Sequence, residues 1–238
     1  EVMNHPEEKF KSIHVAGTNG KGSVCVMLES VLRSSGVSTG LYTSPHLADL
    51  RERIAYRGKK IDFSGISYWV NQIRTRAKKI EPELTYFEML TAVAFCYFAQ
   101  KKVQMGVIEV GLGGRFDATN VLARPDACVI TNIALEHTGY LGNAIRKIAW
   151  EKAGILKKGS ACVTAAESEA LTVILETGKR TGATVIVARP TPSLIKRFAV
   201  LASLKGEYQK KNIAVALKTI RVLREKGWKI SGQALKKG

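Results

Sequence analysis

The sequence is poor in cysteine and has no close pair of cysteines. Its 238 residues include Cys25, Cys96, Cys128 and Cys162, and no Cys-x-x-Cys occurs. Three of the four lie in apolar runs, as expected for buried thiols in a reducing compartment. This spacing argues against a disulfide framework and against a zinc site built from cysteines.

The sequence also lacks a long hydrophobic run. No stretch approaches the roughly 18 consecutive apolar residues of a membrane span, and no signal-peptide pattern is found at the start. Apolar residues make up 45% and charged residues 24%, which are ordinary globular values that exclude a disordered or fibrous chain. We therefore expect a cytoplasmic, monomeric protein without a membrane partner, folded as one domain or one domain with a short extension.

Acidic residues are scarce relative to basic ones. There are 37 lysines and arginines against 20 aspartates and glutamates, a net charge of +17. Residues 189–238 hold thirteen basic and two acidic side chains, so eleven of the net charges lie there. Such a region indicates nucleic-acid binding, attraction of polyanionic substrates or a missing acidic partner segment. The start without Met and the end at Lys-Lys-Gly lead us to expect part of a longer protein.

Apolar periodicity predicts regular alternation of strand and helix. The predicted strands are 12–16, 38–42, 107–110, 127–131, 161–164 and 184–187. The predicted helices are 24–35, 63–80, 86–100, 144–152, 169–181 and 212–226. This order predicts an α/β fold with a doubly wound, mostly parallel sheet. Right-handed crossovers would bring the strand-to-helix loops together at the carboxyl edge of that sheet, where ligands bind.

The loop after the first predicted strand is rich in glycine and reads Gly-Thr-Asn-Gly-Lys-Gly-Ser at residues 17–23. Glycines let backbone N–H groups approach phosphates, and the following helix adds positive potential. Lys21 would supply a charge for the β and γ phosphates, and Ser23 a hydroxyl for Mg²⁺. Gly22 separates Lys21 from Ser23, whereas in the usual phosphate-binding loop the hydroxyl residue follows the lysine directly. The alternative is a plain glycine-rich turn.

Two further residues at strand ends are candidates for chemistry. Glu109 ends an apolar strand just before Gly111, and an unpaired buried carboxylate there would cost several kcal/mol. It therefore needs either a metal ion or donors from the loop backbone. His137 follows a second strand. From the residues alone, a histidine there is more often a helix cap or a satisfied core residue than a ligand.

The 17–23 loop resembles that of folylpolyglutamate synthase and dihydrofolate synthase in the Mur ligase superfamily. Five further segments match in the same order, at residues 42–47, 85–88, 109–120, 130–137 and 151–155. The resemblance covers residues 11 to about 158 and continues more weakly to about 217. It implies that residues 1–238 form a P-loop domain of the Mur ligase central-domain type. The basic part, 189–238, would lead to a C-terminal domain that this chain does not contain.

The resemblance also implies a set of ligands for two Mg²⁺ ions. It assigns Glu109 and Ser23 to a first ion, His137 to a second, and Ser44 to a further contact. An ordinary Ser-Pro turn is the alternative for Ser44. The family has aspartate where this sequence has Glu136.

Lys152, on its own, reads as a solvated helix lysine. The resemblance implies instead that it is carbamylated, which replaces a cation with an anionic oxygen donor suited to two divalent ions. It assigns catalytic roles to Lys21, His137 and Lys152 together.

The resemblance predicts two sets of binding residues. Those for ATP are Thr18, Asn19, Gly20, Lys21, Gly22, Ser23, Gln209 and Asn212. Those for the pteridine substrate are Thr85, Tyr86, Phe87, Glu88, Phe116, Asp117 and Ala118. Tyr208 stands where the family has histidine in its nucleotide-base segment. For the second set, core packing of the aromatic residues and a simple turn at Asp117 are the alternatives.

These assignments predict an ATP-dependent amide ligase that adds L-glutamate to a folate or dihydropteroate carboxylate through an acyl phosphate. Its partners would be these small molecules and no nucleic acid. The alternatives are a Mur-type ligase acting on a UDP-muropeptide and a basic P-loop ATPase that binds nucleic acid. Because the C-terminal domain is absent, we expect this chain alone to bind nucleotide weakly and not to turn over.

Overall fold

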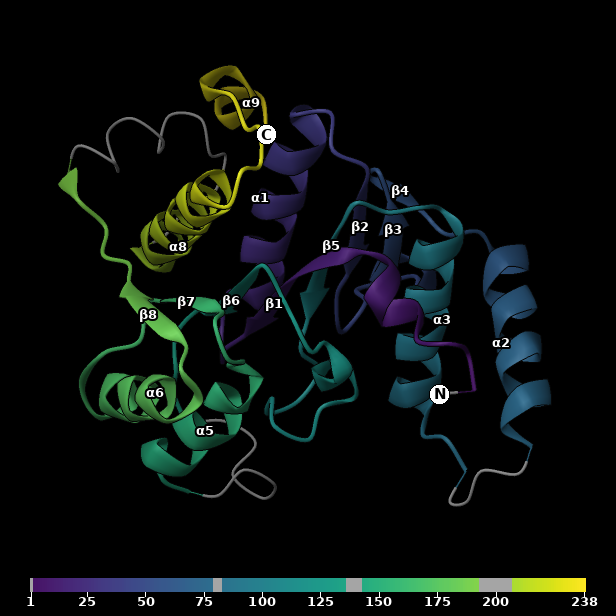
Figure 1. The fold of residues 1–238 in the computed structure, drawn as a ribbon, viewed down its shortest axis with the longest axis horizontal. Coiled ribbons are helices and arrows are strands. Elements are labelled where there is room, and N and C mark those ends of the chain that lie inside the picture. Colours follow the sequence, from purple (N-terminus) through teal and green to yellow (C-terminus); the bar gives the residue numbers. More distant parts are fainter. Residues whose placement is uncertain (1, 79–82, 136–142, 193–206) are drawn as a thin grey trace.

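The computed structural model describes residues 2–78, 83–135, 143–192 and 207–238. In these ranges eight strands form a single sheet at the centre of the molecule (Figure 1). They are β1 (Lys11–Ala16), β2 (Thr39–Tyr42), β3 (Ile54–Tyr56), β4 (Lys59–Lys60), β5 (Met105–Glu109), β6 (Ala127–Ile130), β7 (Ala161–Thr164) and β8 (Thr184–Val187).

The sheet is parallel except at one edge. Its order is β4-β3-β2-β5-β1-β6-β7-β8, and the pairs from β2 through β8 are all parallel. The short strands β3 and β4 pair antiparallel beyond β2. The predicted fold class is therefore confirmed.

Helices cover both faces of the sheet, as Figure 1 shows. On one face lie α1 (Lys21–Ser34), α8 (Glu207–Glu225) and α9 (Gly232–Lys237). On the other lie α2 (Phe63–Ala77), α3 (Tyr86–Gln100), α5 (Ile145–Lys152) and α6 (Ser168–Thr181). Short 3-10 turns occur at η1 (Pro6–Lys9), η2 (Leu50–Arg53), η3 (Ala118–Val121) and η4 (Ala153–Ile155). Within the described ranges, none of the helices could serve as a membrane span.

Alternating side chains of β1 face opposite sides of the sheet, and all of them except Lys11 are buried. Ile13 and Val15 pack in the core under α1, together with Leu28. Ala16 packs in the core on the opposite face, and His14 is also fully buried. A strand covered on both faces must be apolar at nearly every position, which is what parallel sheets require. Ser12 and His14 are therefore exceptions, because both are polar and buried.

The structure adds elements that the periodicity did not predict. The β3–β4 pair and α9 were missed, and α8 begins at Glu207 rather than at residue 212. The helix predicted over 63–80 ends at Ala77, with residues 79–82 outside the described ranges. The missed elements are short, and the two residues of β4 are exposed lysines without an apolar pattern.

Leu28→Ala should lower the free energy of unfolding by about 3–5 kcal/mol, because it leaves a cavity beneath the sheet. Leu28 is fully buried, whereas Leu47 is 97% exposed. Leu47→Ala is therefore the matched control and should change stability by less than about 0.5 kcal/mol. Urea unfolding of both variants tests this, and equal effects would contradict the core assignment.

Candidate nucleotide-binding site

The 17–23 loop connects the carboxyl end of β1 to the first turn of α1. Gly17 and Gly20 have φ angles of +144° and +82°, which side-chain-bearing residues rarely adopt. A Cβ on Gly17 would also collide with the side chain of Thr131. The backbone path of the loop therefore requires glycine at both positions.

Residues that follow β6 hold this loop in place. Asn132 accepts hydrogen bonds from the Thr18 N–H through its backbone carbonyl and from the Asn19 N–H through its side chain, both at 2.8 Å. The hydroxyl of Thr131 donates to the Asn19 carbonyl at 2.7 Å. Sequence reasoning quoted this segment but gave neither Thr131 nor Asn132 a role. The Asn19 N–H is thus used within the protein.

Two lysines from distant parts of the chain meet at one carbonyl of the loop. The Nζ atoms of Lys21 and Lys152 each donate to the Gly17 carbonyl at 2.9 Å, and Lys21 also donates to the Thr18 carbonyl at 3.0 Å. Lys152 is only 2% exposed. Its interpretation as a solvated helix lysine is therefore wrong, and it lies at the predicted site.

Glu109 lies beside the loop at the end of β5. It is 3% exposed, and its Oε2 accepts a hydrogen bond from the Ser44 N–H at 3.2 Å. A Cβ built on Gly22 would lie 3.5 Å from the same oxygen. Burial raises the pKa of Glu109 to about 7, against the opposing effects of the Ser44 bond, Lys21 and Arg53. The carboxylate, the Ser44 turn and the first turn of α1 thus lie together.

A small cavity opens between the 17–23 loop and the glycine-rich segment after β5. Its lining residues are Gly17, Lys21, Val110, Gly111, Leu112, Gly113 and Lys152. Two ammonium groups and a helix N-terminus at one cavity favour an anionic ligand.

Gln209 and Asn212 of α8 lie against the same loop. Both are buried, and the Asn212 amide donates to the Gln209 side-chain carbonyl at 2.9 Å. Asn212 packs so closely on Gly20 that a side chain there would collide with it. The two residues thus lie next to the loop, while their contact with a nucleotide stays a prediction.

Thr85 and Glu88 form a capping box at the start of α3. Glu88 Oε2 accepts from the Thr85 N–H at 2.8 Å, and the Glu88 N–H donates to the Thr85 hydroxyl at 3.3 Å. Phe87 packs against Tyr42, with ring centroids 6.0 Å apart. Tyr86, by contrast, is 60% exposed. The Tyr86 ring is therefore open to a ligand, whereas Phe87 is partly buried.

Asp117 shapes the loop after β5. Its Oδ2 accepts from the N–H groups of Gly111 and Leu112 at 3.0 and 2.9 Å, and its Oδ1 accepts from the Thr119 N–H at 3.0 Å. The expected turn at Asp117 is thus present. The neighbouring Phe116 is 85% exposed. Ala118 begins η3.

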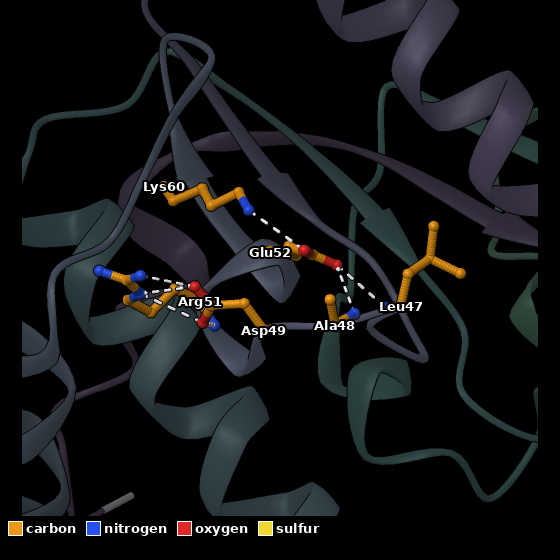
Figure 2. A network of polar contacts seen from close by, with 6 residues as sticks. All are labelled: Leu47, Ala48, Asp49, Arg51, Glu52 and Lys60. Atoms are coloured by element: carbon orange, nitrogen blue, oxygen red, sulfur yellow. Dashed lines mark hydrogen bonds and ion pairs between the residues drawn. The ribbon is translucent and has the colours of Figure 1, made fainter.

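The segment after β2 is fixed by the network in Figure 2. Glu52 accepts from the N–H groups of Leu47 and Ala48 at 2.9 and 3.4 Å and from the Lys60 ammonium at 3.1 Å. Asp49 caps η2 and binds the Arg51 guanidinium. These hydrogen bonds hold the segment that follows Ser44 against the β3–β4 pair.

Arg53 is a residue of this site that the sequence analysis missed. Its Nε donates to His46 Nδ1 at 2.9 Å, and its guanidinium lies 5.8 Å from the centre of the Tyr86 ring. It also lowers the pKa of Glu109. An arginine at the end of the charged run Arg51-Glu52-Arg53 gives no sequence signal of this position.

The predicted metal ligands are only partly described. His137 and Glu136 lie outside the described residues. Within the described residues, no three His, Cys, Asp or Glu side chains form a metal-binding group. Glu109 and the hydroxyls of Ser23 and Ser44 are hard oxygen donors of the type that Mg²⁺ prefers, and the buried carboxylate would be stabilised by a cation. These residues fit Mg²⁺.

Comparison with known proteins identifies a family for most of the chain. The model of the Mur ligase middle domain matches residues 15–220. The mitochondrial folylpolyglutamate synthase of Bos taurus is 37% identical over 235 residues, which is 95% of this chain and 40% of the relative. The dihydrofolate synthase/folylpolyglutamate synthase of Bacillus subtilis is 44% identical over 184 residues, 75% of this chain and 43% of the relative.

A solved structure agrees with these relatives. FolC of E. coli in complex with DHPP and ADP superposes with a TM-score of 0.85 at 30% identity, covering 99% of this chain and 59% of that one. The chain thus spans about two fifths of the curated relatives it matches.

Glu109→Gln should stabilise the ligand-free protein at high pH. Below pH 4.5 the carboxyl group is protonated in both the folded and the unfolded chain, so it has no effect on stability. Between 4.5 and about 7 the unfolded chain loses its proton first, which progressively destabilises the folded state, and above about 7 the penalty is constant. The variant should gain up to about 3 kcal/mol at pH 8 and little at pH 4.

Urea unfolding without nucleotide at pH 4 and pH 8 measures this difference. Glu169→Gln, which removes an exposed carboxylate, is the matched control and should change little at either pH. A pH-independent effect of Glu109→Gln would contradict the prediction.

Proposed function

The chain belongs to the Mur ligase middle-domain family, and from this we propose that residues 1–238 form the ATP-binding domain of a glutamate ligase. The enzyme would add L-glutamate to the carboxylate of a folate or dihydropteroate. The names of the curated relatives support this reaction class.

One observation carries the proposal. Lys21 and Lys152 both reach the Gly17 carbonyl, and Glu109 lies beside the same loop with Ser44. These residues come from four separate segments, namely the first turn of α1, the last turn of α5, the end of β5 and the turn after β2. A site for a nucleotide triphosphate and its cations explains why they meet at the carboxyl edge.

The residues have separate roles in this proposal. The 17–23 loop and Lys21 bind the phosphates, and Gln209 and Asn212 bind the base. Ser23, Ser44, Glu109 and His137 hold Mg²⁺, in two sites. When bound, Mg²⁺ neutralises charge on the transferred phosphoryl group.

Lys152 is proposed to be carbamylated. In the structure its amine and that of Lys21 share one acceptor, which places two cations close together. Conversion of Lys152 to a carbamate would replace repulsion with attraction and add oxygen donors next to the proposed metal ligands.

The folate or dihydropteroate substrate would lie on the side of the exposed aromatic residues. Tyr86 and Phe116 are 60% and 85% exposed and suit a flat heterocycle. Thr85, Phe87, Glu88, Asp117 and Ala118 belong to the same two segments. Because the Thr85, Glu88 and Asp117 side chains are hydrogen-bonded within the protein, they would shape this site as much as contact the ligand.

The reaction follows from this arrangement. The acceptor carboxylate attacks the γ-phosphorus of ATP, forming an acyl phosphate and releasing ADP. The amino group of glutamate then attacks the acyl carbon, and phosphate leaves as the amide forms. Lys21 and the backbone N–H groups of the loop stabilise the charge on the phosphoryl oxygens. The net charge of +17 attracts three anionic reactants.

A monomeric state and a cytoplasmic location complete the proposal. The bovine relative is named as mitochondrial, so the expected compartment differs from that of this relative.

Because the chain spans 40% of that relative, we propose that the chain alone binds nucleotide without turnover.

The function is tested by ATP-dependent incorporation of labelled glutamate by the full-length protein. We expect incorporation with dihydropteroate or tetrahydrofolate and none with a UDP-muropeptide. Incorporation with the muropeptide alone would favour the Mur-type alternative. Steeply salt-dependent DNA or RNA binding without any ligation would favour the nucleic-acid-binding ATPase.

Lys21→Met should weaken binding of AMPPCP with Mg²⁺ by about 10–100-fold, because a charge-assisted contact to phosphate is lost. Lys158→Met removes an exposed lysine from the turn after η4 and serves as the matched control. Titration calorimetry of the 238-residue chain gives both affinities. Equal affinities for the two variants would argue against the proposed phosphate site.

A further inference from the structure

His14 is a buried polar residue that the proposed chemistry does not use. It lies in the middle of β1 with no exposed surface, opposite Ile108 of β5 and Cys128 of β6. Its Nε2 lies 2.8 Å from the Thr119 hydroxyl. Its Nδ1 has no hydrogen-bond partner among the described residues.

A continuous series of hydrogen bonds leads from His14 to the cavity. The Thr119 hydroxyl donates to Asp117 Oδ1 at 2.5 Å. Asp117 Oδ2 in turn accepts from the N–H groups of Gly111 and Leu112. Both of these residues line the cavity that Lys21 and Lys152 face. The series thus joins the centre of the sheet to one wall of the candidate site.

The direction of each bond can be deduced. Thr119 has one hydroxyl proton, which it donates to the carboxylate, so it must accept from His14. Burial, with a smaller effect of Lys157, lowers the pKa of His14 to about 3, so the ring is neutral and has a single N–H. That N–H is therefore on Nε2. Nδ1 is left as a bare acceptor, which matches its lack of a partner in the described ranges.

Packing alone does not account for a histidine here. The neighbouring positions across the sheet, Ile108 and Cys128, are buried apolar residues. A buried acceptor without a partner is unfavourable, and an aliphatic side chain at position 14 would avoid it. The contribution of His14 must lie in the hydrogen bond that it donates to Thr119.

We propose that His14 is a positioning residue that aligns the Gly111–Leu112 backbone at the cavity through Thr119 and Asp117. Its catalytic consequence rests on the proposed function. By orienting the Thr119 hydroxyl, His14 orients the Asp117 carboxylate, and Asp117 fixes backbone that lines the same cavity as the two lysines. His14 itself does not touch the reactants.

Amide hydrogen exchange of Gly111 and Leu112, followed by NMR without ligand, tests the alignment directly. His14→Leu and Thr119→Val should each speed exchange at these two amides about tenfold, the factor expected from losing a hydrogen bond in the series. His14→Gln keeps an N–H donor near the Nε2 position and should restore slow exchange. Ser12→Ala, on the same face of β1, is the matched control and should leave these amides unchanged.

The double variant separates a direct connection from general loosening. Because His14→Leu and Thr119→Val break the same link, the double variant should exchange no faster at Gly111 and Leu112 than either single variant. The proposal would be overturned if the rate increases of the two single variants multiply in the double variant. Unchanged exchange in both single variants would overturn it as well. A circular-dichroism spectrum of each variant establishes that it is folded.

Activity provides a second, separate readout. In the full-length enzyme, His14→Leu should lower kcat at least tenfold for ligation, while His14→Gln retains most of it and AMPPCP affinity stays the same. If no ligation is found in the unmodified enzyme, the proposed function fails and the exchange experiment still decides the alignment. If ligation is normal in His14→Leu, the positioning role is wrong and the proposed function stands.

Discussion

The backbone carbonyl of Gly17 is the point on which the arrangement of the site depends. Lysines 131 residues apart, Lys21 in the first turn of α1 and Lys152 at the end of α5, donate to this one atom. The contact ties a helix on one face of the sheet to a helix on the other. It is possible because Gly17 lies directly after β1, where the first turn of α1 and the last turn of α5 both reach it. The same constraint brings Glu109 and Ser44 to the loop.

The fold was largely predictable because a parallel sheet leaves a strong sequence signal. Strands buried on both faces are continuous apolar runs, and intervening helices show a different period. The β3–β4 pair escaped prediction because it is short, partly exposed and antiparallel. Glu109 could be selected as a candidate from the sequence because it is a carboxylate at the end of an apolar strand. Asn132 and Arg53 were missed because their roles depend on which groups they meet after folding, the Asn19 N–H for Asn132 and the His46 ring for Arg53.

The segments expected to bind substrate illustrate a different limit. Thr85 and Glu88 form a helix cap, and Asp117 binds the N–H groups of its own loop. A loop near a ligand must first satisfy its own polar backbone, and nearby carboxylates are the strongest available acceptors. A sequence pattern shared with a family therefore cannot separate residues that hold a loop from residues that touch a ligand. Only the coordinates show that these oxygens are already engaged.

The lysine pair of β4 has a consequence for how this molecule meets others. An unprotected outer strand offers free amide and carbonyl groups on which a foreign strand can add. Here the outer strand is two residues long and presents only Lys59 and Lys60, both exposed. An edge strand this short and this charged offers few backbone hydrogen bonds to an incoming strand. Strand addition and fibril growth are therefore disfavoured along that edge of the sheet, and a companion domain or subunit that contacts it would do so through side chains and not by adding a strand.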